Sequence, residues 1–124
     1  MEELNKKLAK WANWVYDEGA EYIGGGGNNT SLMYGLWYPP GDHKTGFTSP
    51  PHFTESLDAC FKWLVPKLEH WSLWWGISRA SGLAHGSNNA EVWIRHAYGY
   101  AYDDNTTALA FCLALEKLVD AKKS

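Results

Sequence analysis

HWSLWWGIS, residues 70–78, alternates between two sets of side chains in the way a β-strand does. One face of this strand would carry Trp71, Leu73, Trp75 and Ile77. The other face would carry Trp74 among small residues. A second alternating run, AEVWIRHAYGYAY, spans residues 90–102, and the residues between the runs are rich in Gly, Ser and Asn. The two runs therefore predict an antiparallel hairpin around a loop at residues 79–89.

The phase of the second run decides which of its side chains lie together. Unbroken alternation would place one set on one side, namely Val92, Ile94, His96 and Tyr98. The other side would carry Trp93, Arg95 and Ala97. We expect Trp71 and Trp75 to be core residues, whereas Trp74 and Trp93 fall on the opposite phase of their strands.

Two helices are predicted before the hairpin. The first has apolar residues three or four positions apart, with Gly19 as a stop, at Leu4, Leu8, Trp11 and Val15. The second is capped by Thr54 and has its apolar stripe at Leu57, Phe61, Leu64 and Leu68. Pro66 should kink this helix or end its regular part near Val65.

A third helix follows the hairpin, and short strands lie between the first two helices. Asp103, Asp104 or Asn105 would cap the third helix, whose apolar face carries Leu109, Cys112, Leu115 and Val119. AEYI (20–23) and SLMYGLWY (31–38) read as strands, the second closed by Pro39 and Pro40. The glycines at 24–27 suit a flexible loop, with an anion-binding nest as the alternative. The element order predicts an α+β fold with a small antiparallel sheet and one or two helical layers.

Composition limits the class of protein. The 124 residues suit a single domain, and the formal charge of −3 argues against general nucleic-acid binding while leaving room for a small anionic ligand. The charged opening MEELNKKLAK lacks the apolar centre of a signal peptide, and no apolar run has the ~20 residues of a membrane span. We therefore expect a cytoplasmic protein with no membrane partner. Cys60 and Cys112 fall among apolar residues and are expected to be reduced core thiols rather than a disulfide.

Three segments resemble those of a family of small phage proteins. They are MEELNKKLAKWANW (1–14), FTSPPHFTESLDACFKWLVPKLEHWSLWWGIS (47–78) and AYGYAYDDNTTALAFCLALEKL (97–118). In layout they are similar to the phage ABA sandwich domain. The resemblance implies an α/β/α sandwich over residues 1–124, a phage or prophage origin and the cytoplasm of an infected bacterial host. It implies no catalytic residues.

No catalytic set stands out in the sequence. The five histidines show no metal-ligand spacing, and HExxH and CxxC motifs are absent. GGGGNNTS (24–31) lacks the lysine of a phosphate-binding P-loop, and His43 replaces the required glycine in GDHKTG (41–46). Helix capping explains Asp103 and Asp104 better than acid–base chemistry does. We expect no cofactor, no metal and no enzymatic activity.

The eight tryptophans suggest a function. If helices cover both faces of the sheet, the surplus is core packing and self-association. If one face is open, Trp74 and Trp93 form a platform that stacks flat ligands. Trp37 and Tyr38 could close over it, and nearby cations could hold phosphates. The expected ligand-binding residues are Trp37, Tyr38, Lys44, Trp74, Arg79, His85, Trp93 and Arg95.

These observations predict a homo-oligomeric protein that binds a small anionic nucleotide. By analogy with other small phage proteins, it would act as a sponge that sequesters a nucleotide signal of bacterial immunity, an anti-defence role. One alternative is a structural or protein-interaction module whose aromatic residues bury an interface. A second is a nucleotide-modifying enzyme using His85, His96 or Asp103.

Overall fold

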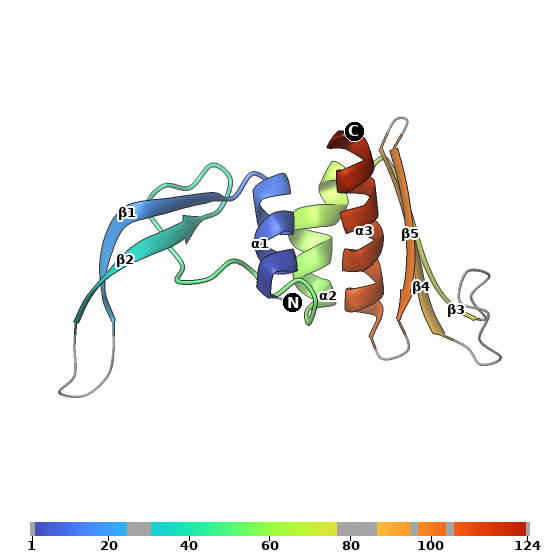
Figure 1. Cartoon of the computed structure of the whole chain (residues 1–124), viewed down its shortest axis with the longest axis horizontal. Helices are drawn as coiled ribbons and strands as arrows, with labels where there is room; N and C mark the ends of the chain where they lie inside the picture. Colours follow the sequence, from blue (N-terminus) through green and yellow to red (C-terminus); the bar gives the residue numbers. More distant parts are fainter. Residues whose placement is uncertain (1, 25–30, 77–86, 95–96, 104–105, 124) are drawn as a thin grey trace.

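A computed structural model describes residues 2–24, 31–76, 87–94, 97–103 and 106–123. The elements are α1 (Glu2–Trp11), β1 (Val15–Gly24), β2 (Ser31–Tyr38), α2 (Leu57–Ala59), η1 (Cys60–Leu64), η2 (Val65–Lys67), β3 (His70–Gly76), β4 (Ser87–Ile94), β5 (Ala97–Asp103) and α3 (Thr107–Lys123). In Figure 1 the described helices form a layer between the two-stranded ribbon β1–β2 and the three-stranded sheet β3–β4–β5. The expected α+β class, with helices packed beside small antiparallel sheets, is confirmed, and among the described residues the helices lie on one side of the three-stranded sheet.

The three-stranded sheet has the order β3-β4-β5, and both strand pairs are antiparallel. The predicted pairing of the two alternating runs is therefore confirmed for β3 and β4, but β4 already begins at Ser87. The second run is two strands rather than one, because the chain reverses between Ile94 and Ala97. This reversal corrects the predicted phase: Tyr98 lies opposite Trp93 in the register, so the two share a face.

The first helix is shorter than the sequence pattern suggested, since it ends at Trp11 and Val15 already belongs to β1. Asn13 adopts a left-handed conformation, with φ of 70°. Its N–H donates to the carbonyl of Lys10 at 3.1 Å, and the N–H of Trp14 donates to the carbonyl of Ala9 at 2.9 Å. These two bonds form a Schellman motif with Asn13 in the position that glycine usually takes.

The second helical segment also departs from the expected regular helix. Its N-cap is Ser56, whose Oγ accepts from the N–H of Ala59 at 3.2 Å. Thr54, the expected cap, instead donates its N–H to Oδ1 of Asn5 at 3.0 Å and so joins this segment to α1. Only α2 is α-helical, because η1 widens to a π-helix and η2, which contains Pro66, tightens to a 3₁₀ turn.

The third helix begins at the predicted place with a different cap. Oγ1 of Thr106 accepts from the N–H of Leu109 at 3.1 Å, and Oδ2 of Asp103 accepts from the N–H of Thr106 at 2.7 Å. Thr106 is therefore the capping residue and Asp103 fixes its backbone. Asp104 and Asn105 lie outside the described residues.

The core lies between α3, α1, the second helical segment and the inner side of the sheet. Its largest fully buried apolar side chains are Phe53, Phe111, Leu8, Leu64, Leu115 and Leu118. Cys60 and Cys112 are free and buried, with their sulfurs 3.8 Å apart, which confirms that both are core residues. None of the described helices combines the length and apolar character that crossing a bilayer requires.

Candidate functional site

Strand β5 separates small from aromatic side chains. Ala97, Gly99 and Ala101 point toward α3, which packs against β5 and β4. Strand alternation therefore directs Tyr98, Tyr100 and Tyr102 away from α3. Through the register, the side chains that share this face come from all three strands, and we call them the outer face: His70, Ser72, Trp74, Asn89, Glu91, Trp93, Tyr98, Tyr100 and Tyr102. Figure 1 shows no described helix over it.

One aromatic cluster lies at the end of the outer face nearest residues 94–97. His70, Trp93 and Tyr98 are opposite one another on the three strands. The ring of Trp93 lies 4.7 Å from that of His70 and 5.1 Å from that of Tyr98, centroid to centroid. Trp93 is therefore held between two neighbouring rings while staying half-buried.

A second cluster lies further along the strands. The rings of Trp74 and Tyr100 are stacked, with centroids 6.0 Å apart and planes inclined by 24°. The hydroxyl of Tyr100 donates to Oδ1 of Asn89 at 2.5 Å, and Nδ2 of Asn89 donates to the carbonyl of Ser87 at 2.9 Å. Asn89 is fully buried, so these bonds fix the orientation of Tyr100 under the exposed Trp74.

A carboxylate lies between the two clusters. The hydroxyl of Tyr98 donates to Oε2 of Glu91 at 2.6 Å. Partial burial, followed by this hydrogen bond, raises the pKa of Tyr98 to about 12 although the residue is 45% exposed, so the phenol is neutral at physiological pH. Because Glu91 is negative, a phosphate would be repelled from the centre of the outer face. The described part of the outer face contains no lysine or arginine.

Of the predicted ligand-binding residues, two lie together on the outer face and two lie in a different part of the molecule. Trp74 and Trp93 share the outer face as expected. Trp37 and Tyr38 lie in β2, across the helical layer from the sheet (Figure 1), and Trp37 is only 4% exposed and pairs with Phe47. The expectation that these two residues close over the platform is therefore wrong, because they pack on the ribbon side of the molecule.

The predicted cations contribute less than expected to the described site. Lys44 lies exposed in the turn after β2, where its N–H donates to Oδ1 of Asp42 at 2.8 Å. It is therefore on the ribbon side with Trp37 rather than near Trp74. Arg79, His85 and Arg95 lie outside the described residues, as does His96. Their assignment to the site stays a prediction.

Sequence reasoning missed the tyrosines and His70 and misplaced two tryptophans. The alternation of tyrosine with small residues in AYGYAY (97–102) predicts that the three tyrosines share one face of a strand. The prediction of one unbroken strand over residues 90–102 assigned that face wrongly. Trp71 and Trp75, expected in the core, are 37% and 66% exposed. They do point to the helical side, but α3 packs against β5 and β4 and not to a comparable extent against β3.

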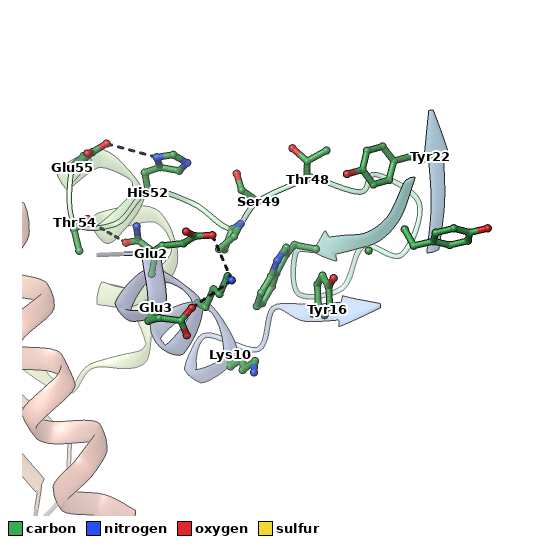
Figure 2. Close-up of a pocket in the computed structure, with 16 residues that line it drawn as sticks. Glu2, Glu3, Lys10, Tyr16, Tyr22, Thr48, Ser49, His52, Thr54 and Glu55 are labelled. Carbon is green, nitrogen blue, oxygen red and sulfur yellow. Dashed lines mark hydrogen bonds and ion pairs between the residues drawn. The ribbon is translucent and has the colours of Figure 1, made fainter. Parts of the chain in front are cut away.

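A cavity of about 870 Å³ lies between α1, the ribbon and residues 48–55. Figure 2 shows Tyr16 and Tyr22 on its ribbon side and Glu2 and Glu3 on its helix side. Most of its charged side chains are paired with one another. Nζ of Lys6 lies 3.5 Å from Oε1 of Glu2 and 3.6 Å from Oε1 of Glu3. Nδ1 of His52 lies 3.6 Å from Oε2 of Glu55. The outer face instead groups indole and phenol rings in two clusters around a single carboxylate, so we favour it as the candidate site.

Within the described residues, no group of three or more His, Cys, Asp or Glu side chains is placed to hold a metal ion. Comparisons of the chain with models of protein families, with curated proteins and with solved structures gave no match. The resemblance to the phage family therefore stays a prediction.

Proposed function

We propose that the protein binds a nucleotide by stacking its bases on the outer face and holds it without chemical change. The observation that carries this proposal is the pair of aromatic clusters, Trp74–Tyr100 and His70–Trp93–Tyr98, on a sheet face that the described helices leave uncovered. Stacking a base on such a ring contributes roughly 1–3 kcal/mol.

The spacing of the clusters suits a ligand with two flat groups. His70 and Trp74 are four residues apart on β3, which corresponds to roughly 13 Å along a strand. A dinucleotide could place one base on each cluster. Its phosphates lie on the linkage between the two nucleosides, so in this pose they would project away from the sheet and from Glu91. Bidentate contacts to them from Arg79 and Arg95, which lie outside the described residues, are part of the proposal.

The biological role we propose is sequestration of a nucleotide signal, as expected from the phage-like layout. The aromatic face supports the binding step, and the phage-like layout supports the role. A phage protein that held such a signal would keep it from the immune effector that it activates. The proposal requires the ligand to be released intact.

The test is a binding screen with cyclic dinucleotides, cyclic trinucleotides and ADP-ribose, read by tryptophan fluorescence and thermal shift. A ligand at a hundred times its dissociation constant raises the unfolding free energy by about 2.7 kcal/mol. Trp93→Ala should weaken binding by roughly 5-fold to 150-fold, the equivalent of one stacked base. The matched control is Tyr34→Ala, which removes an aromatic ring that is 58% exposed on the ribbon.

Three outcomes would contradict the proposal. Binding that Tyr34→Ala abolishes and Trp93→Ala preserves would place the ligand in the cavity, which Tyr34 lines. Recovery of a chemically altered nucleotide from the denatured complex would indicate an enzyme. No binding to any nucleotide in the panel would favour the protein-interaction alternative.

A further inference from the structure

Strand β3 is an edge strand without the usual protection. Among the described strands it pairs with β4 alone, over seven consecutive residue pairs that contain no bulge. Its sequence, HWSLWWG, has no proline, lysine, aspartate or glutamate. Natural proteins use such residues, or bulges, to keep a free edge from pairing with another chain. The edge of β3 that no described strand pairs with is therefore suited to receive a further strand.

The helical side of β3 carries exposed aromatic rings. Trp75 is 66% exposed and Trp71 is 37% exposed, although both point to the side on which the helices lie. Phe61 of the second helical segment contacts Trp71 with ring centroids 5.1 Å apart and is itself 38% exposed. Apolar side chains grouped in this way at a free strand edge are typical of an interaction surface.

We propose that this edge pairs with β3 of a second copy of the chain, antiparallel about a two-fold axis at Leu73, to form a continuous six-stranded sheet. Opposed residues of an antiparallel pair lie on the same face of the sheet. Alternative registers of the two β3 strands therefore differ from one another by an even number of residues. The axis at Leu73 uses the full length of β3. It places Trp71 opposite the partner subunit's Trp75, and Trp75 opposite the partner subunit's Trp71.

This pairing resolves the exposure of both tryptophans. Each copy contributes two tryptophans, so the dimer has two cross-strand tryptophan pairs on the helical side of β3, and aromatic cross-strand pairs stabilise a sheet. On the outer face, Ser72 meets the partner subunit's Trp74, which leaves room for the indole. No two like charges become opposed, because β3 has no Lys, Arg, Asp or Glu.

The area is sufficient for a small specific interface. A tryptophan presents roughly 150–250 Å² for burial. The exposed parts of Trp71 and Trp75 together amount to about one whole side chain per copy. With Phe61, Trp74 and the strand backbone from both copies, the total approaches the ~1,000 Å² at which specific interfaces begin. A dimer that dissociates on dilution is expected.

The ribbon is the competing apolar surface, and its charges disfavour self-pairing. Its most exposed apolar side chain is Ile23, at 77%. Strand β1 also carries Asp17, Glu18 and Glu21, which two copies would bring together as like charges. The inference does not rest on the proposed function, because it is argued from Trp71 and Trp75 on the other face of β3, although the pairing also brings Trp74 beside the partner subunit's Ser72.

The first experiment is the concentration dependence of the mass of the full chain, measured by sedimentation. We expect a reversible dimer whose dissociation constant rises at least about 30-fold in Trp75→Lys, equivalent to the 2 kcal/mol of one hot-spot residue. Ile23→Lys, which places the same charge at another exposed apolar position, should leave the dimer unchanged. Far-ultraviolet circular dichroism should show both variants folded.

A monomeric wild-type chain at the highest concentration would overturn the proposal, and so would a dimer that Ile23→Lys dissociates. The register has its own test. Leu73→Cys should form an intermolecular disulfide on mild oxidation, because opposed Cα atoms about 4.5–5.5 Å apart fall within disulfide geometry. Ser72→Cys, opposite a tryptophan, should not. Cross-linking of Ser72→Cys alone would overturn the axis at Leu73.

Discussion

At the scale of single residues, Tyr98 and Glu91 couple the outer face to pH. The phenol hydroxyl of Tyr98 donates to Glu91 at 2.6 Å, and burial together with this bond raises the pKa of Tyr98 to about 12. In an unfolded chain a tyrosine titrates near ~10. Between these values only the unfolded state loses the proton. The contribution of Tyr98 to folding is therefore complete below about pH 10 and is lost as the pH rises toward about 12.

Tyr98→Phe tests this coupling. The variant should lose no more than about 1 kcal/mol of unfolding free energy at neutral pH, the value of one hydrogen bond. It should also lose less stability than the wild type between about pH 8 and about pH 11, because the titrating phenol is gone. Urea unfolding at both pH values measures the difference. An equal alkaline loss in both proteins would show that Tyr98 does not titrate as described.

Residue-level prediction succeeded where alternation was unbroken. Trp74 and Trp93 were correctly placed on one face. Strands β3 and β4 pair over seven consecutive residues without a bulge, so the alternation of each strand is kept throughout. Tyr98 was placed on the wrong face, because the reversal after Ile94 occurs within IRHA (94–97), which contains neither Gly nor Pro. The common turn signals are therefore missing at the position that decides the composition of the outer face.

At the scale of elements, the approach of α3 to β5 depends on one missing side chain. A Cβ built on Gly99 would lie 1.9 Å from the carbonyl oxygen of Ala114. The small residues Ala97 and Ala101 flank Gly99 on the same side of β5, and Ala110 and Ala114 are buried on α3. Small residues on both elements let the helix and the strand lie close together, which also directs the tyrosines outward.

Gly99→Ala should therefore destabilise the fold by about 1–3 kcal/mol or more, because backbone on both sides must move to admit a methyl group. Gly19→Ala in β1 is the matched control, since its Cβ would meet Asp17 Oδ1 at an ordinary 3.5 Å. Denaturant midpoints of the two variants measure the contrast. Equal midpoints would mean that α3 can shift away from β5 at little cost.

The ends of elements were less predictable than their presence. All three helical segments were expected from apolar periodicity, but α1 ends four residues before Val15. Asn13 supplies the left-handed residue that follows the end of α1, a position at which the sequence pattern led us to expect a glycine. Likewise, Thr54 is a good cap by type, yet its N–H is used by Asn5, a long-range contact that local sequence does not reveal.

At the scale of the whole molecule, the position of α3 decides which predicted core residues are buried. Alternation correctly placed Trp71 and Trp75 on the helical side of β3. It could not show that α3 would lie over β4 and β5, which depends on Gly99 and the alanines around it. The two tryptophans are therefore exposed, and this is the property on which the proposed pairing of β3 depends.

The ribbon and the sheet should differ in local stability. Figure 1 shows β1 and β2 extending away from the helical layer, and a two-stranded ribbon has little stability of its own in water. Near its base, Trp37 is buried and pairs with Phe47. Toward its far end, Ile23 and Leu32 are paired with each other and are 77% and 54% exposed. We therefore expect the far end to open without unfolding of the core.

Amide hydrogen exchange measures this difference. Amides at residues 21–24 and 31–34 should exchange at least about 100-fold faster than those of β4, which corresponds to about 2.7 kcal/mol less opening free energy. Amides of α3 serve as the internal reference for the core. Equal protection of the ribbon and β4 would mean that the ribbon is held by a contact beyond its own two strands. Because the proposed dimer joins β3 edges, dilution should lower the protection of β3 and leave that of the ribbon unchanged.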